Sequence, residues 1–257
     1  MPNPMSNNPL PQAYRYAIYL NPAAPFRMVG EQWLGRSAET GEAIARPAAH
    51  DAHRLAQIAR WTEAPAYYGL HATLKAPFRL ADGQTPAGLD AAMRAFALDR
   101  QPFAVPLALH NLRGFLAWCL GGDASANARM HALADAAVRE FDSFRAPPTP
   151  AELARRKPGQ LSEPARRMLD AWGYPYAFET FIFHITLTGL LDESEQDSAI
   201  AMLQAASGPL LQQPMTVSDV SLFVQSTPDA PFLAARHYGF DGSTTDAAGA
   251  ALLEATA

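Results

Sequence analysis

The chain has 257 residues, of which 49% are hydrophobic and 18% charged, so it can build a sizeable core and lies far from the composition of disordered proteins. Its 20 Lys and Arg against 25 Asp and Glu give a net charge of −5, which argues against a general attraction to nucleic acid or anionic lipid. The lone Cys119 excludes an internal disulfide, and no apolar run reaches the ~20 residues of a membrane span. We therefore expect a soluble, cytoplasmic protein.

Predicted strands and helices alternate along the first half of the chain. Residues 14–20 are aromatic and β-branched, which is typical of a strand, and residues 47–61 carry apolar side chains at helical spacing. Residues 68–80 form a second predicted strand, and residues 89–98 a second helix. Residues 103–120 predict two short strands around a turn.

The second half repeats this order of elements. A helix is predicted over residues 126–141, a strand over 178–189, a helix over 195–211 and a hairpin over 215–240. An element order that recurs at one spacing is the usual mark of an internal repeat. The repeat indicates a duplication into two α+β lobes.

These elements predict one bilobal domain over residues 13–240. Its first lobe covers about 13–122 and its second about 123–240. The ends of the chain, residues 1–12 and 241–257, are poor in large apolar side chains. We expect a disordered N-terminal tail and a flexible C-terminal tail.

Each predicted lobe carries the same pattern in its strand, His71-Ala72-Thr73-Leu74 and His184-Ile185-Thr186-Leu187. His-x-Thr alone is a weak signal, but here both copies occupy the same place in the repeated order. Because side chains alternate along a strand, each His and Thr share a polar face, which Lys75 and Thr188 extend. If the lobes pack about a pseudo-two-fold axis, two imidazoles, three hydroxyls and one ammonium meet across a cleft.

This set of groups suits a phosphate ester. One imidazole can take a proton from an attacking water or hydroxyl, the other can give one to the leaving oxygen, and the threonines can bind the non-bridging oxygens. The chemistry needs no metal or other cofactor and predicts a bell-shaped pH dependence with limbs between about 5 and 8. The sequence does not say which histidine is the acid.

Further candidates lie around the motifs and in a basic, proline-rich insertion, residues 143–180, which has no counterpart in the first lobe. Helical patches are predicted there at 151–157 and 164–172. The insertion is expected to act as a lid whose arginines clamp a second phosphate, although a solvated helix face is the simpler interpretation. Besides Lys75 and Thr188, the candidates for substrate binding are Arg79, which could instead be a solvated strand end, and Arg145, Arg155 and Arg156. Four tyrosines, each of which could instead pack in the core, complete the set: Tyr16, Tyr68, Tyr174 and Tyr176.

The twin His-x-Thr strands, 113 residues apart, resemble the 2H phosphoesterase superfamily, whose members act on cyclic phosphates and 2′,5′ linkages. Over residues 15–240 the chain also resembles a phosphonate-metabolism group encoded beside carbon-phosphorus lyase genes. The segments that carry this resemblance are RYAIYL, WLGR, YGLHATLKAPFRL, FRAP, ELARR, WGYPYAF and FHITLTG. The chain departs from the group at Tyr67, where an arginine commonly precedes Tyr-Gly.

The resemblance implies a bilobal α+β fold, with two pseudo-symmetric lobes whose antiparallel sheets flank a central cleft and whose helices lie outside. It implies that His71 and His184 are catalytic and that Thr73 and Thr186 bind phosphate. The implied activity is metal-independent hydrolysis of a small cyclic phosphodiester. In the setting of carbon-phosphorus lyase, the implied substrate is a ribose cyclic phosphate with a second phosphate.

Two other functions stay open from the sequence. An RNA-end 2′,3′-cyclic phosphodiesterase predicts an extended basic groove, which the net charge of −5 argues against. A non-catalytic phosphate-ligand binder predicts tight product binding without turnover. We expect a monomer whose partner is a small phosphorylated sugar or nucleotide, with no metal, other cofactor or membrane partner.

Overall fold

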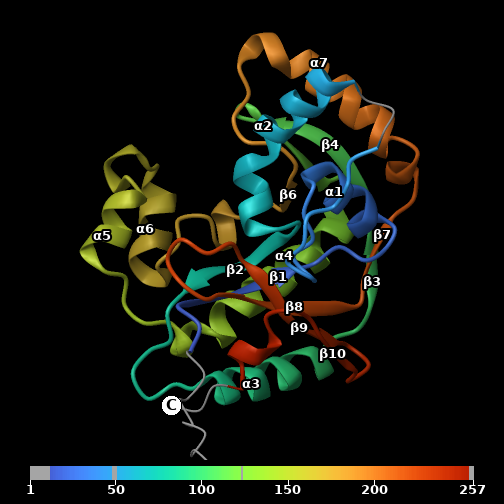
Figure 1. The fold of residues 1–257 in the computed structure, drawn as a ribbon. Helices are drawn as coiled ribbons and strands as arrows, with labels where there is room; N and C mark the ends of the chain where they lie inside the picture. Colours follow the sequence, from blue (N-terminus) through green and yellow to red (C-terminus); the bar gives the residue numbers. More distant parts are fainter. Residues whose placement is uncertain (1–11, 48–50, 123, 255–257) are drawn as a thin grey trace, which may run out of the picture.

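The computed structural model describes residues 12–47, 51–122 and 124–254, so the tail expected at 1–12 lies outside it except for Gln12. A single eight-stranded sheet runs through the molecule (Figure 1), and every neighbouring pair of its strands is antiparallel. In spatial order its strands are β10 (Thr244–Asp246), β9 (Leu233–Gly239), β8 (Asp219–Gln225), β1 (Arg15–Leu20), β2 (Ala72–Phe78), β6 (His184–Thr186), β5 (Phe115–Leu120) and β4 (Leu107–Leu112). Two short strands, β3 (Phe103–Val105) and β7 (Met215–Val217), pair separately.

Helices lie at both ends of this sheet, and the predicted α+β class is confirmed. In Figure 1 α1, α2 and α7 gather near β6 and β4, whereas α3 lies along β8 to β10. Helix α4 packs on β2. The α-helices of the described residues are α1 (Phe26–Leu34), α2 (Ala52–Tyr68), α3 (Pro86–Leu98), α4 (Ala124–Glu140), α5 (Pro150–Arg155), α6 (Glu163–Trp172) and α7 (Glu193–Ser207).

The sheet does not divide at the boundary expected between the lobes. The β4–β5 hairpin of the first half pairs with β6 of the second, and the β8–β9 hairpin of the second half pairs through β8 with β1 of the first. The two strands that carry the His-x-Thr motifs, β2 and β6, are direct neighbours. In place of two sheets flanking a cleft, the structure has one continuous sheet with both motifs at its centre.

Strand β1 is central because both of its faces are apolar. Tyr16, Ile18 and Leu20 belong to the main hydrophobic core, whereas Ala17 and Tyr19 belong to a smaller cluster on the opposite face. A strand buried on both sides reads as a continuous apolar run, which is the pattern of RYAIYL. The smaller cluster forms part of the face that carries both motif histidines.

Two helices differ from the sequence-based expectation. Helix α1 was not predicted, and it ends at Gly35, whose φ of 76° favours glycine. Helix α2 continues through Pro65 to Tyr68, beyond the predicted end at residue 61, because Thr62 and Pro65 are buried with Trp61 against the body of the protein. This longer α2 brings Tyr68 beside the first motif.

The insertion contains the two expected helices, as α5 and α6. Helix α5 begins with a capping box, in which the Thr149 hydroxyl accepts from the Glu152 amide and the Glu152 carboxylate accepts from the Thr149 amide. Helix α6 starts after Ser162, whose hydroxyl accepts from the Ala165 amide. Together they form a projection from the body of the molecule in Figure 1.

The C-terminal segment is ordered from residue 241 to 254, where the composition led us to expect a flexible tail. Strand β10 adds to the edge of the sheet, and Leu253 is buried in the main core.

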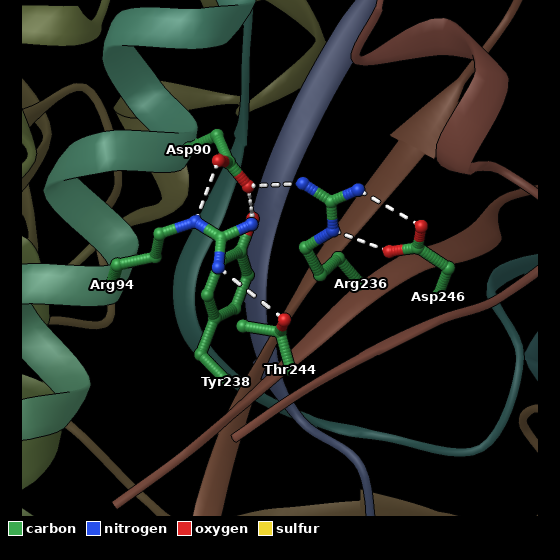
Figure 2. Close-up of polar contacts among 6 residues, drawn as sticks. All are labelled: Asp90, Arg94, Arg236, Tyr238, Thr244 and Asp246. Carbon is green, nitrogen blue, oxygen red and sulfur yellow. Dashed lines mark hydrogen bonds and ion pairs between the residues drawn. The ribbon is translucent and has the colours of Figure 1, made fainter. Parts of the chain in front are cut away.

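Figure 2 shows how α3 is attached to the β9–β10 edge of the sheet by Asp90, which accepts hydrogen bonds from Arg236 (2.8 Å), Tyr238 (2.7 Å) and Arg94 (2.9 Å). Arg236 also pairs bidentately with Asp246, and Arg94 reaches Thr244. Short polar residues alone gave no hint of these long-range bonds.

Replacing Asp90 with alanine is expected to lower the free energy of unfolding by about 2–3 kcal/mol, since it leaves Arg236 and Tyr238 without their shared acceptor. Burial would raise the pKa of Asp90, but hydrogen bonds from Tyr238, Arg94 and Arg236 outweigh it and lower that pKa. The carboxylate therefore stabilises the fold above its unfolded-state pKa, and this stabilisation is lost as the pH falls through its folded-state pKa. Urea unfolding at pH 7 checks this, with the exposed Asp82→Ala as control; equal losses in both variants would contradict it.

Candidate active site

The two motif histidines face each other diagonally across the β2–β6 pair. Ala72 lies opposite Ile185 in the register, and both side chains belong to the main core. One step to either side, the antiparallel register sets His71 against Thr186 and Thr73 against His184. These four side chains therefore share the face opposite the core, and side chains directly opposite one another have Cβ atoms ~5 Å apart.

Each imidazole is held in the same way. The Nδ1–H of His71 donates to the carbonyl of Gly69 (2.8 Å), and the Nδ1–H of His184 donates to the carbonyl of Ile182 (2.8 Å), in both cases two residues earlier. Such a bond fixes the tautomer and leaves Nε2 as the nitrogen available for proton transfer. The two halves of the chain thus present equivalent nitrogens to one face of the sheet.

Burial makes both imidazoles weaker bases than usual. It lowers the pKa of His71 to about 4, with a smaller contribution from the charge of His184 and an opposing one from the Gly69 carbonyl. Burial also lowers the pKa of His184, against the effect of the Ile182 carbonyl. At neutral pH both imidazoles are therefore mainly neutral, and His71 lies close enough to His184 for a charge on His184 to lower the pKa of His71 further.

Aromatic side chains that the sequence did not single out support both histidines. The ring of Tyr19 stacks on His71, with 3.8 Å between ring centroids and 19° between planes. Phe115 meets His184 edge-on at 5.7 Å. Tyr19 lies on β1, directly opposite Thr73, so only the long-range strand pairing reveals this contact.

The threonines of the two motifs have different surroundings from Thr188. Thr73 and Thr186 are half-buried, and within the described residues no protein group bonds their hydroxyls. Thr188 is fully buried, and its hydroxyl accepts a hydrogen bond from the amide of Leu116 (2.9 Å). Thr188 thus fastens the chain after β6 to β5, which leaves the two motif threonines as the free hydroxyls.

Lys75 does not share the face of His71, contrary to the expectation from strand alternation. Tyr19 faces Thr73, yet the next residue of β1, Ile18, faces Lys75, so the register shifts between them. This irregularity turns Lys75 to the opposite face. There its Nζ is buried and donates to Val138 O and Asp142 Oδ1, both at 3.1 Å, and burial lowers the pKa of Lys75 to about 8 despite Asp142.

Among the candidate tyrosines, Tyr16 also lies away from the site. It is fully buried in the main core beside Phe78, and burial raises its pKa to about 12. Tyr68 is 40% exposed, stacks on Phe232 and lies 6.4 Å from the His71 ring. Tyr176 is exposed and touches the ring of Tyr174 edge-on. Tyr68 is therefore the candidate tyrosine that reaches the first motif.

Two cavities adjoin at Tyr68. The first is mostly apolar and contains His71 and Thr186, together with Ala64, Pro65, Tyr68, Gly69, Phe115, Thr188, Gly189 and Leu190. The second, of about 230 Å³, is lined by Tyr68 and by five arginines, Arg15, Arg79, Arg145, Arg155 and Arg156, with Glu152 as its one carboxylate. The structure thus brings four predicted arginines together next to the histidine site, and adds Arg15 from β1.

Two of these arginines are neutralised by carboxylates. Arg145 forms a bidentate pair with Asp142 (2.8 and 3.1 Å), and Arg79 pairs with Glu152 (3.4 Å) and donates to Pro147 O (2.8 Å). Burial would raise the pKa of Glu152, but the Thr149 amide and Arg79 outweigh it and lower that pKa. The Arg79–Glu152 pair joins the residue after β2 to α5 of the insertion, whereas the Arg145–Asp142 pair is local, so both arginines act as structural partners as well as cavity walls.

Groups of three or more His, Cys, Asp or Glu side chains that could hold a metal ion are absent from the described residues. Across the same residues, every helix is too short or too polar to cross a membrane. Cys119 is buried in β5, where burial raises the pKa of its thiol to about 11.

Together, the fold and this site define an α+β protein with paired histidines on adjacent central strands and a neighbouring arginine-lined cavity. Residues 73–233 match the family described as "Protein of unknown function (DUF1045)", and the chain belongs to that family.

The curated relatives of the chain are longer proteins. It is 38% identical over 227 residues to "Ribose 1,5-bisphosphate phosphokinase PhnN" of Laribacter hongkongensis (86% of this chain, 51% of that protein). It is 31% identical over 235 residues to the protein of the same name in Janthinobacterium sp. (89% and 51%). The chain spans about half the length of each of these relatives.

Among solved structures, the chain is similar to Kluyveromyces marxianus Usb1 with uridine monophosphate (TM-score 0.38, 11% identity, 86% of this chain and 97% of that chain). It is similar to the same Usb1 without a named ligand (TM-score 0.37, 10% identity, 87% and 98%). Scores this low do not establish a shared fold.

Proposed function

We propose that this chain is a metal-independent phosphodiesterase of the 2H type that hydrolyses a small cyclic phosphate ester. The observation that carries the proposal is the arrangement of the two motifs, which set His71 with Thr186 and Thr73 with His184 on one face of the sheet. Equivalent Nδ1 hydrogen bonds leave both Nε2 atoms available. A pair of histidines flanked by free hydroxyls is suited to in-line displacement at phosphorus.

In this mechanism His71 is the base, because its low pKa keeps it neutral, and His184 is the acid. The Nε2 of His71 takes a proton from water as the water oxygen forms its bond to phosphorus. The P–O ester bond on the opposite side breaks, and the Nε2–H of protonated His184 delivers its proton to the leaving oxygen. Hydroxyls of Thr73 and Thr186 donate to the non-bridging oxygens, and the products are a phosphomonoester and an alcohol on one molecule.

The substrate we propose is a ribose cyclic phosphate that carries a second phosphate. The name of the two relatives concerns ribose 1,5-bisphosphate, a pentose with two phosphates. P-loop kinases hold ATP with G-x-x-x-x-G-K-S/T, a motif absent from this sequence, so we infer from the relatives only the kind of substrate. The arginine-lined cavity beside the histidines accommodates such an additional charge.

A nucleoside 2′,3′-cyclic phosphate, as at an RNA end, is the second candidate substrate. It is favoured by one observation, the apolar cavity formed by Phe115, Pro65 and Leu190 next to His71, which could hold a base. Turnover of purified protein on both substrates separates the candidates. We expect the doubly phosphorylated ribose to have the higher kcat/KM; tight product binding without turnover of either would instead indicate a non-catalytic binder.

Chelation is expected to leave the rate unchanged, because proton transfer and charge stabilisation are assigned to histidine and threonine side chains rather than to a metal-bound water. The measurement is the initial rate before and after dialysis against EDTA. Loss of activity that a divalent ion restores would refute the two-histidine mechanism.

A further inference from the structure

Unpaired hydrogen-bond donors gather on the side of His71 that faces the insertion. Within the described part of the chain, the hydroxyls of Tyr19, Tyr68 and Tyr174 have no protein partner, although the Tyr19 side chain is only 1% exposed. In the same part of the chain, Arg15 and Arg156 have no carboxylate within ion-pair distance. Arg15, Arg156 and Tyr68 line the arginine-lined cavity, and donors left without acceptors beside a cavity indicate a place for an anion.

Contacts with shared aromatic rings show that these donors lie close together. The guanidinium carbon of Arg15 lies 5.5 Å from the ring centre of Phe232, and the rings of Tyr19 and Tyr68 lie 6.2 and 5.5 Å from the same ring. Arg156 covers the ring of Tyr174 at 5.0 Å. Burial raises the pKa of Tyr19 well above its usual value; Tyr68 and Tyr174 act in the same direction, whereas the charges of Arg15 and Arg156 oppose it.

The structure also fixes how Arg15 is aimed. The Nε of Arg15 donates to Gln225 Oε1 (2.7 Å), which leaves its two terminal nitrogens free. Gln225 is fully buried, and its amide nitrogen donates to Tyr67 Oη, Pro228 O and Ala230 O, so it cannot turn its oxygen away from Arg15. Through Gln225, Tyr67 thus supports a guanidinium supplied by β1.

We propose that Arg15, Arg156, Tyr19, Tyr68 and Tyr174 form a second anion subsite that binds the outer phosphate of a doubly phosphorylated sugar. This subsite deepens the proposed function and rests on it for the position of the reacting phosphate. Tyr19 connects the histidine site with the proposed anion subsite, because its ring stacks on His71 and its hydroxyl is one of the unpaired donors.

The subsite distinguishes two neighbouring arginines of the insertion. Arg156 is half-buried over Tyr174, whereas Arg155 is exposed at the rim of the cavity. A half-buried guanidinium loses less of its interaction to solvent than an exposed one does. We therefore expect Arg156 to contribute more than Arg155 to binding the outer phosphate.

The test compares ribose cyclic phosphate with and without a 5-phosphate on the variants Arg15→Ala, Arg156→Ala and Tyr19→Phe. We expect each arginine variant to raise KM for the 5-phosphorylated substrate by one to two orders of magnitude and to change the other substrate by less than threefold. Tyr19→Phe keeps the ring against His71 and should raise the same KM by up to tenfold. Arg166→Ala, which removes an exposed charge from the same insertion, is the matched control.

Calorimetric titration of ribose 1,5-bisphosphate and ribose 1-phosphate into the same variants tests the subsite without turnover. The arginine variants should weaken binding of the bisphosphate alone. Equal losses on both ligands, or losses matched by Arg166→Ala, would overturn the subsite. Bisphosphate binding that depends on Arg15 and Arg156 in a protein that hydrolyses neither cyclic ester would retain the subsite and overturn the proposed function.

Discussion

Replacing either His71 or His184 with alanine is expected to lower turnover of the cyclic phosphate by about 10²–10⁴, the range associated with loss of a general acid or base. The two variants should show similar losses, because the register gives the two imidazoles equivalent places and equivalent Nδ1 bonds. The double variant should lose little more than either single one, since acid and base act in the same displacement. Initial rates under saturating substrate measure this.

Loss of fold must be separated from loss of chemistry. His71→Asn can retain a donor to the Gly69 carbonyl while removing the ring nitrogen used for proton transfer, so it should be as inactive as the alanine variant and as stable as the wild type. His110→Ala removes an exposed histidine from β4 and should keep full activity. Rates within a few-fold of wild type for folded His71 and His184 variants would show that the pair is structural.

The pH profile of kcat/KM is expected to peak in the mildly acidic range, below the usual imidazole pKa of 6.5. This parameter reports the free enzyme, in which His71 must be neutral and His184 protonated. The first condition holds above pH about 4, and the second fails as the pH rises through the lowered pKa of His184. Beyond that point the rate should fall up to tenfold per pH unit, so the acidic limb lies below the range of 5 to 8 expected from sequence.

Substrate binding should move the alkaline limb. Two phosphate groups add negative charge beside His184 and favour its protonated form, so the alkaline limb of kcat should lie at higher pH than that of kcat/KM. His184→Ala should abolish the alkaline limb in both profiles. A kcat/KM that stays level from pH 5 to 9 would contradict the assignment of acid and base.

The motif residues were recognisable in the sequence because a short pattern recurred in equivalent places, and a pattern of period two is enough to put His and Thr on one face. The order of strands in the sheet was not recognisable. Strand β1 pairs with β8, near the other end of the sequence, and β5 pairs with β6, across the boundary between the two halves. Lys75 shows the same limit on a smaller scale. We predicted the face of Lys75 from regular alternation of side chains along the strand, and one shift of register between β1 and β2 puts Lys75 on the opposite face.

The sequence shows where the arginines are, but not which of them are paired with a carboxylate. Arg145 and Arg156 look alike in a basic segment, yet Asp142 neutralises the first and no described carboxylate pairs with the second. Arg15 lay outside the basic segment, and its orientation by Gln225 depends on a strand pair joining positions 15 and 225. Tyr19 had no signal of its own, since an aromatic residue in a central strand is ordinary core.

The direct pairing of β2 with β6 also determines which parts of the molecule are able to move during catalysis. A hinge between the two halves of the chain would have to break backbone hydrogen bonds in the middle of the sheet, so the distance between the two imidazoles is locked rather than adjustable. We therefore expect the central strands to stay fixed and any opening of the site to come from the projecting segment that carries α5 and α6. The ion pair between Arg79 and Glu152 holds this segment to the end of β2, so raising the ionic strength should loosen the segment while leaving His71 and His184 in place.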